Sequence, residues 1–131
     1  AEFGISSRRV PGRTGVWVDV SSEPECEEKL AAIGVRLSRW VTSHGFAYNV
    51  STDLRYFDLI VPCGIADRRA TSLEKLLAHG ADGKGLEISE VSSRIAAHLG
   101  DVFGIDLRAS SLDTLNAQLC EYEEQHVASI A

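Results

Sequence analysis

The chain has 131 residues, of which 44% are hydrophobic and 24% are charged, a balance that can fill the core of one modest domain. Its formal net charge of -6 argues against a general nucleic-acid-binding protein, which would normally carry a basic face. No apolar run approaches the roughly 20 residues that a membrane-spanning helix needs. We therefore expect no nucleic-acid partner and no membrane span.

The first part of the chain alternates between loop and strand patterns. Residues 8–15 are basic and rich in proline and glycine, which predicts a loop. Residues 15–20 alternate β-branched and aromatic side chains with smaller or polar ones, which predicts a strand. An acidic stretch that contains proline predicts another loop over residues 21–28.

Residues 29–41 fit both a helical and an alternating, strand-like pattern. The turn signal Thr42-Ser-His-Gly45 and the strand-like run over residues 46–50 favour two strands of a β-hairpin. Gly34 would lie inside the first of these strands. A glycine at that place predicts either a β-bulge or a ligand that lies against the backbone.

After Asp58, the short apolar run Leu59-Ile-Val61 leads into the sequence Pro62-Cys63-Gly64. We expect a buried strand that stops at Pro62, because proline fixes φ and removes a backbone donor. The thiol of Cys63 would then lie at the lip of the sheet, where the following glycine allows a ligand close to the backbone. A further short strand is predicted over residues 71–77.

Two helices are predicted towards the end of the chain. Ser89 is the expected N-cap of the first, and Gly104 is its expected end. Ser110 or Ser111 would cap the second, whose outer face is acidic. Apolar residues recur at helical spacing in the first (Ile88, Val91, Ile95, Leu99, Val102) and in the second (Leu112, Leu115, Leu119, Tyr122).

Cys63 is the first candidate for chemistry, and its sequence context leaves two interpretations open. The thiol is either a small buried hydrophobic group or a nucleophile. Cys26, in an acidic loop, and Cys120, beside Glu121, are expected to be inert because nearby carboxylates disfavour the thiolate. The chain has no Cys-x-x-Cys pair and no histidine spacing typical of a metal site, so we expect no bound metal.

Lys29 is either an ordinary solvated lysine or a partner of Cys63. In the second case its ammonium group would lower the pKa of the thiol, and its amine would then move protons as general base and acid. His44 could pair with a cysteine, although a histidine in a turn more often faces solvent. Three arginines either hold a phosphate or belong to a solvated loop: Arg8, Arg9 and Arg13.

Taken together, five ordered stretches resemble the lipoyl(octanoyl) transferase family, the octanoyl-acyl-carrier-protein:protein N-octanoyltransferases. Their order and spacing, including the 34 positions from Lys29 to Cys63, are similar to that family's pattern. They cover most of residues 12–103, which makes the resemblance specific. The stretches span residues 12–18, 29–36, 44–50, 56–65 and 71–74.

The resemblance implies an α+β fold of the biotin/lipoate protein ligase-like (class II synthetase-like) type, a mixed sheet with helices. This chain would hold the C-terminal portion of that fold. Residues 1–104 would belong to the catalytic domain, and residues 105–131 would form an acidic helical extension. The family's Arg-Gly-Gly loop and His-Gly-Pro-Gly segment do not occur in this chain. A second polypeptide or segment would supply that N-terminal half.

The resemblance also implies a reaction, namely the transfer of an octanoyl group from acyl carrier protein to a lysine of a lipoyl domain. Cys63 would hold the acyl group as a thioester, and Lys29 would lower the pKa of Cys63. The acceptors would be the lipoyl domains of 2-oxo acid dehydrogenases and the glycine cleavage H protein. Two segments would bind the acyl chain: Ala32, Ile33 and Gly34, and Gly45, Phe46 and Ala47.

No cofactor is implied, because the acyl donor is already an activated thioester, and the compartment would be the mitochondrial matrix or the bacterial cytoplasm. Two other functions compete with this one. The chain could be an inactive, octanoyltransferase-derived structural subunit of a larger assembly, such as a mitochondrial one. It could also be a related ATP-dependent ligase of the biotin/lipoate type, against which the Pro-Cys-Gly corner argues.

Overall fold

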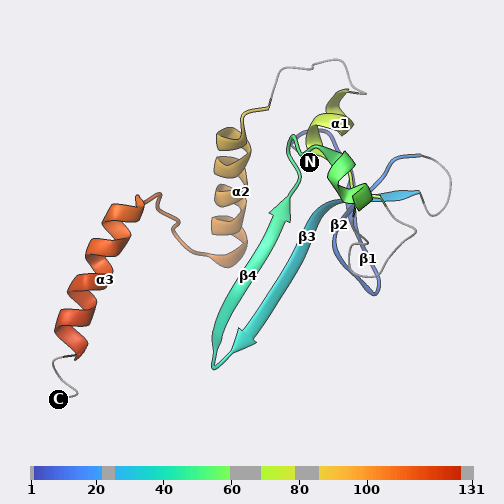
Figure 1. The fold of residues 1–131 in the computed structure, drawn as a ribbon. Helices are drawn as coiled ribbons and strands as arrows, with labels where there is room; N and C mark the ends of the chain where they lie inside the picture. The colour runs from blue at the N-terminus through green and yellow to red at the C-terminus, as the bar shows by residue number, and fades with distance from the viewer. Residues whose placement is uncertain (1, 22–25, 60–68, 79–85, 128–131) are drawn as a thin grey trace. The chain divides into compact units, whose positions relative to one another are not determined.

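The computed structural model describes residues 2–21, 26–59, 69–78 and 86–127 (Figure 1). The chain divides into two compact units, Ala1–Val91 and Ser92–Ala131. The first unit contains the β-sheet and the buried core, and the second contains most of the last two helices. The predicted boundary between residues 104 and 105 concerns the catalytic domain, and it stays a prediction.

Four antiparallel strands form one sheet in the order β1-β2-β3-β4. Their bounds are β1 Ser7–Val10, β2 Arg13–Asp19, β3 Glu27–Ser38 and β4 Val41–Tyr48. Strand β2 pairs with β3 only as far as Ala31, so beyond that residue β3 has β4 as its neighbour. Figure 1 shows this part of β3 and β4 as a two-stranded hairpin that extends past the other strands. Residues 32–38 are accordingly exposed.

The β1-β2 hairpin replaces the loop that was predicted over residues 8–15, and that prediction is wrong. Gly12 has a φ of 75°, which suits the tight turn that follows Pro11. Arg8 then donates hydrogen bonds to Asp19 on β2, at 3.0 Å, and to Glu27 on β3, at 2.7 Å. The strand predicted over residues 15–20 is confirmed by β2, and the acidic loop ends earlier than expected, because β3 begins at Glu27.

The hairpin predicted after residue 29 is confirmed, but its turn is not where the sequence signal placed it. The chain turns at Arg39 and Trp40, whose φ values are 49° and 65°. Both adopt the left-handed region without being glycine, so composition gave no marker for the turn. Residues 42–45 lie in β4, and the bulge predicted at Gly34 is absent, since Gly34 pairs directly with Gly45.

Helix α1 (Leu73–Ala78) corrects the strand that was predicted over residues 71–77. The hydroxyl of Ser72 accepts a hydrogen bond from the backbone N–H of Lys75 at 3.2 Å, so Ser72 acts as the N-cap. Leu73 is fully buried at the start of the helix. Among the described residues of the first unit, the other buried apolar side chains are Trp17, Val18, Leu30, Ala31, Val50 and Val91.

Replacing Lys75 by methionine is expected to lower the free energy of unfolding by about 1–2 kcal/mol, because it leaves a largely buried carboxylate without its partner. The Lys75 ammonium lies 2.7 Å from a carboxylate oxygen of Glu28, whose side chain is only 11% exposed. Urea denaturation measures the change. The matched control is Arg55→Met, because the Arg55–Asp53 pair is solvent-exposed on the Arg55 side. An equal loss in both variants would contradict the prediction.

The segment before Cys63 also differs from expectation where the structure describes it. Residues Leu54–Leu59 form a short 3-10 helix, η1, so the strand that was predicted to stop at Pro62 is wrong at Leu59. Hydrogen bonds from Arg55 lower the pKa of Asp53, just before η1, to about 2. The remainder of that predicted strand and the Pro62-Cys63-Gly64 corner lie outside the described residues.

Both predicted helices are confirmed, as α2 (Ile88–Phe103) and α3 (Leu112–Val127). Helix α2 begins before Ser89, so Ser89 lies in its first turn and is not the N-cap. Gly104 ends α2 with a φ of 63°, as expected. Ser111 caps α3, because its hydroxyl accepts a hydrogen bond from the Thr114 N–H at 3.1 Å. In the described part of the chain, no helix has the length and apolar character that crossing a membrane requires.

Candidate functional site

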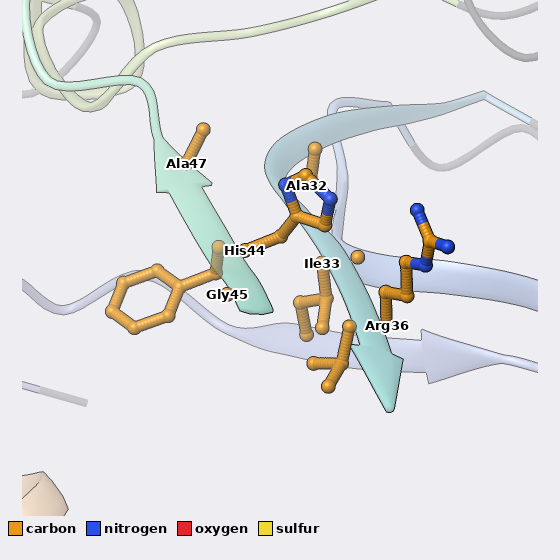
Figure 2. Close-up of a pocket in the computed structure, with 9 residues that line it drawn as sticks. Ala32, Ile33, Arg36, His44, Gly45 and Ala47 are labelled. Carbon is orange, nitrogen blue, oxygen red and sulfur yellow. The ribbon is translucent and has the colours of Figure 1, made fainter. Parts of the chain in front are cut away.

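A groove of about 730 Å³ lies along the extended part of the β3-β4 hairpin. Residues 32–36 of β3 and residues 44–47 of β4 line it (Figure 2). The lining includes all six residues that the resemblance assigns to acyl binding: Ala32, Ile33, Gly34, Gly45, Phe46 and Ala47. The hairpin therefore brings the two predicted segments together, side by side on paired strands.

One face of this hairpin carries unusually small side chains. Ala32 pairs with Ala47, and two residues further towards the tip Gly34 pairs with Gly45. Because alternate residues of a strand share a face, these two pairs lie on the same side of the sheet. A Cβ built on either glycine would meet no heavy atom within 4 Å among the described residues. The small pairs therefore leave a strip of backbone that an extended chain could approach closely.

The opposite face offers an apolar surface. Ile33 pairs with Phe46, and these side chains are 43% and 49% exposed. Figure 2 shows the Ile33 side chain on the other side of the ribbon from those of Ala32 and Ala47. The alternation thus separates a face of methyl groups and bare backbone from a face of larger hydrocarbon groups.

A β-bulge between β2 and β3 decides which of these faces Lys29 shares. Val16 pairs with Ala31, but Trp17 pairs with Lys29, so Leu30 is an extra residue on β3. Directly opposed residues share a face, and neighbouring residues of β2 point to opposite faces. Lys29 therefore lies on the face opposite to Ala31, which is the face of the alanine and glycine pairs. Without the bulge, the lysine would lie on the other side of the sheet.

The position of Lys29 is fixed by its side chain and by its backbone. Its ammonium nitrogen lies 4.8 Å from the ring centroid of Trp17, a cation–π distance, and the Trp17 side chain is 1% exposed. Gly15 leaves room for the lysine stem, because a Cβ at that position would lie 3.3 Å from the Lys29 Cε. The backbone N–H of Lys29 donates to the Arg69 carbonyl, and its carbonyl accepts from the Thr71 N–H, each at 2.9 Å.

Cys63, the predicted nucleophile, lies outside the described residues, so its approach to Lys29 stays a prediction. The other two cysteines are free: Cys26 is half-buried and Cys120 is exposed on α3. Searching the described residues finds no group of three or more histidine, cysteine, aspartate or glutamate side chains that could hold a metal ion.

Three residues around the site carried no clear signal in the sequence. Gly15 and Trp17 looked like ordinary members of a strand, yet both lie against the Lys29 side chain and position it. His44, which was expected in a turn, lies in β4 with a φ of 71° and lines the groove. Only a known pairing register could have identified these roles, because they depend on which strands lie opposite one another.

Comparison with known proteins places these observations in one family. Residues 1–100 match the family described as the lipoyl protein ligase A/B catalytic domain. The chain is 54% identical over 104 residues to an octanoyltransferase of Acidobacterium capsulatum, which covers 79% of this chain and 41% of the relative. An octanoyltransferase of Christiangramia forsetii is 44% identical over 108 residues (82% and 44%). One from Synechococcus elongatus is 40% identical over 118 residues (90% and 45%).

The relatives are matched over only part of their own length. This chain spans less than half the length of each of these curated relatives. The matched part includes Lys29 and both strands that line the groove.

Proposed function

Because this chain belongs to the lipoyl protein ligase A/B catalytic domain family, we propose that it transfers an octanoyl group from acyl carrier protein to a lysine of a lipoyl domain. The relatives named octanoyltransferase support this reaction class. The observation that carries the proposal is the bulge at Leu30, which puts Lys29 on the same face of β3 as the alanine and glycine pairs. The lysine that would activate the thiol and the residues that would bind the acyl chain would then lie on one face of the sheet.

In the proposed reaction, the Cys63 thiolate attacks the carbonyl carbon of the octanoyl thioester. A new carbon–sulfur bond forms and the bond to the carrier protein's sulfur breaks, and the Lys29 ammonium would give that leaving sulfur its proton, so that the carrier leaves as a thiol and Lys29 becomes an amine. The amine of the acceptor lysine then attacks the octanoyl-cysteine, forms an amide and expels the Cys63 thiolate. The Lys29 ammonium would stabilise the thiolate, and its amine would move the proton that the acceptor loses.

The octanoyl chain would lie over the Gly34–Gly45 pair. Neither residue carries a Cβ, so the hydrocarbon could contact the backbone directly, and the methyl groups of Ala32 and Ala47 would border its carbonyl end. Burying an apolar chain against such a surface is favourable by about 0.8 kcal/mol for each methylene group. This mode of binding needs no charged group on the ligand.

The position of Arg69 supports a meeting of Cys63 with Lys29. Arg69 follows Cys63 by six positions in the sequence, and its carbonyl accepts the hydrogen bond from the Lys29 N–H. The segment that contains Cys63 thus rejoins the described structure beside the lysine. We propose that the same segment brings the thiol within reach of the ammonium group.

The part of the relatives that this chain does not span would complete the site in our proposal. The face of β3 and β4 beyond Ala31 is exposed, which suits cover by a second polypeptide or segment. The reported relatives come from bacteria, which favours the bacterial cytoplasm over the mitochondrial matrix.

Mass spectrometry tests the reaction directly. The protein, with the remaining part of the family domain supplied, is incubated with octanoyl-acyl carrier protein, and the peptide that contains Cys63 is analysed. We expect an octanoyl adduct on Cys63, which disappears when a lipoyl domain is added. The absence of any adduct, with both substrates intact, would overturn the proposed function. Incubating this chain alone shows whether the remaining part is required.

Replacing Gly34 by valine is expected to lower the rate of octanoyl transfer at least about tenfold, the equivalent of 1.4 kcal/mol. The new side chain would project into open space in the groove, so it would obstruct the acyl chain without a clash inside the protein. Steady-state transfer rates and thermal unfolding measure the two effects. The matched control, Thr42→Val, lies on the opposite face and should keep the wild-type rate. An unchanged rate in Gly34→Val would place the acyl chain elsewhere.

A further inference from the structure

Arg8 lies on the same face of the sheet as Lys29. It is opposed to Trp17 across the β1-β2 pair, and Trp17 is opposed to Lys29 across the β2-β3 pair, so the three residues form one row. From the sequence, Arg8 was expected either to hold a phosphate or to lie in a solvated loop. Its guanidinium group instead binds two carboxylates, those of Asp19 at 3.0 Å and of Glu27 at 2.7 Å.

Glu27 is a carboxylate that could compete for Lys29. The two residues are separated by one position on β3, so they share a face, and their Cα atoms are about 6.8 Å apart. The Glu27 side chain is only 8% exposed, and a carboxylate buried to that extent is costly without a cationic partner. Arg8 is that partner in the structure. The ammonium group of Lys29 is an alternative partner on the same strand and face.

The Lys29 ammonium group is held by a partner without charge, the indole ring of Trp17. The lysine stem leans towards Gly15, which precedes Trp17 on β2, whereas the partner of Glu27 across the strands, Asp19, follows Trp17. None of the ion pairs among the described residues involves Lys29. The ring attracts the cation without adding a negative charge, so it does not offset the effect of the ammonium group on a nearby thiolate.

We infer that Arg8 is a positioning residue of the transfer reaction, which holds Glu27 and so leaves the Lys29 ammonium group against Trp17 without a carboxylate partner. The inference rests on the proposed function, in which that ammonium group stabilises the Cys63 thiolate. In the absence of Arg8, the buried carboxylate of Glu27 would draw the ammonium group to itself. Its negative charge would then offset the positive charge that lowers the pKa of the thiol.

The variant Arg8→Met tests this role, with the remaining part of the family domain supplied. We expect octanoyl transfer at pH 7 to fall about tenfold, since losing the effect of a nearby charge lowers the thiolate fraction by that order. The pH midpoint for alkylation of Cys63 by iodoacetamide should move upward. Adding Glu27→Gln to the same chain should restore the rate and the midpoint, because an amide does not neutralise the Lys29 ammonium group.

The matched control is Lys75→Met, which also leaves a largely buried carboxylate, that of Glu28, without its cation. Glu28 is adjacent to Glu27 on β3 and therefore points to the opposite face of the sheet, away from Lys29. This variant should lose stability and yet keep the wild-type transfer rate and alkylation midpoint. Thermal unfolding of each variant gives the folded fraction by which its rate is corrected.

Three results would overturn the inference and leave the proposed function intact. They are an unchanged alkylation midpoint in Arg8→Met, a loss of rate that Glu27→Gln does not restore, and an equal loss of rate in Lys75→Met. A wild-type protein that forms no octanoyl adduct and transfers no octanoyl group would overturn the proposed function itself.

Discussion

Replacing Cys63 by alanine is expected to abolish octanoyl transfer, with a loss on the order of 10³-fold or more, because the variant lacks the atom that would hold the acyl group. The octanoyl adduct should vanish with it. Intact-protein mass spectrometry and a transfer assay with a lipoyl domain measure both effects. Substrate binding should survive, since residues of β3 and β4 line the groove.

The matched control for this loss is Cys120→Ala, since Cys120 is exposed on α3, outside the sheet unit. It should transfer octanoyl groups at the wild-type rate. A Cys63→Ser variant with full activity would contradict a cysteine thioester. A serine hydroxyl ionises far less readily than a cysteine thiol, so it is a much weaker nucleophile in this position. Loss of transfer with the adduct still present would assign the acylated residue to another position.

Replacing Gly15 by valine is expected to lower the free energy of unfolding by more than about 3 kcal/mol. The φ of Gly15 is 135°, a value that a β-branched residue does not adopt without strain. A Cβ there would also lie 2.6 Å from the Ala31 carbonyl oxygen, which belongs to the neighbouring strand and cannot move alone. The same Cβ would lie 3.3 Å from the Lys29 Cε, so the lysine stem that contacts the Trp17 ring would have to shift. The free energy of unfolding, measured by urea denaturation, and the rate of octanoyl transfer should therefore both fall.

Gly12→Ala separates the two causes of that destabilisation. Gly12 also has a positive φ, 75°, but a Cβ there would meet no atom within 4 Å in the described residues. The left-handed backbone alone costs roughly 1–2 kcal/mol for alanine. We expect Gly12→Ala to show only that smaller loss and to keep its transfer rate. An equally large loss in Gly12→Ala would mean that the conformational term, and not the clash with β3, dominates at Gly15.

Much of the fold follows from local patterns in the sequence. The alternation after residue 29 predicts the β3-β4 hairpin, and three- and four-residue spacing predicts α2 and α3, because each pattern records one buried or apolar face. The turn at Arg39 and Trp40 could not be found this way, since neither residue is a usual left-handed residue. Helix α1 was missed because its six residues are too few for periodicity to outweigh the surrounding strand-like composition.

The groove residues could be identified by resemblance, because the two motifs fall on strands that pair in register. What the sequence could not indicate is the face on which each residue lies. The side of Lys29 depends on an extra residue relative to β2, and the side of His44 depends on one backbone angle. The first is a property of strand pairing and the second of local backbone conformation, so neither can be predicted from composition.

The bulge at Leu30 has a consequence for how this segment can change in length. Side chains in a strand alternate with a period of two. A single insertion or deletion between Lys29 and Ala32 would therefore move every following side chain of β3 to the opposite face of the sheet. Lys29 would then be separated by the sheet from the alanine and glycine pairs. Length changes in this stretch should be tolerated only in steps of two, or when a second single-residue change removes the bulge. The number of residues between Lys29 and the alanine and glycine pairs is thus constrained in two ways. It must place the lysine close to these pairs, and it can change only in steps of two.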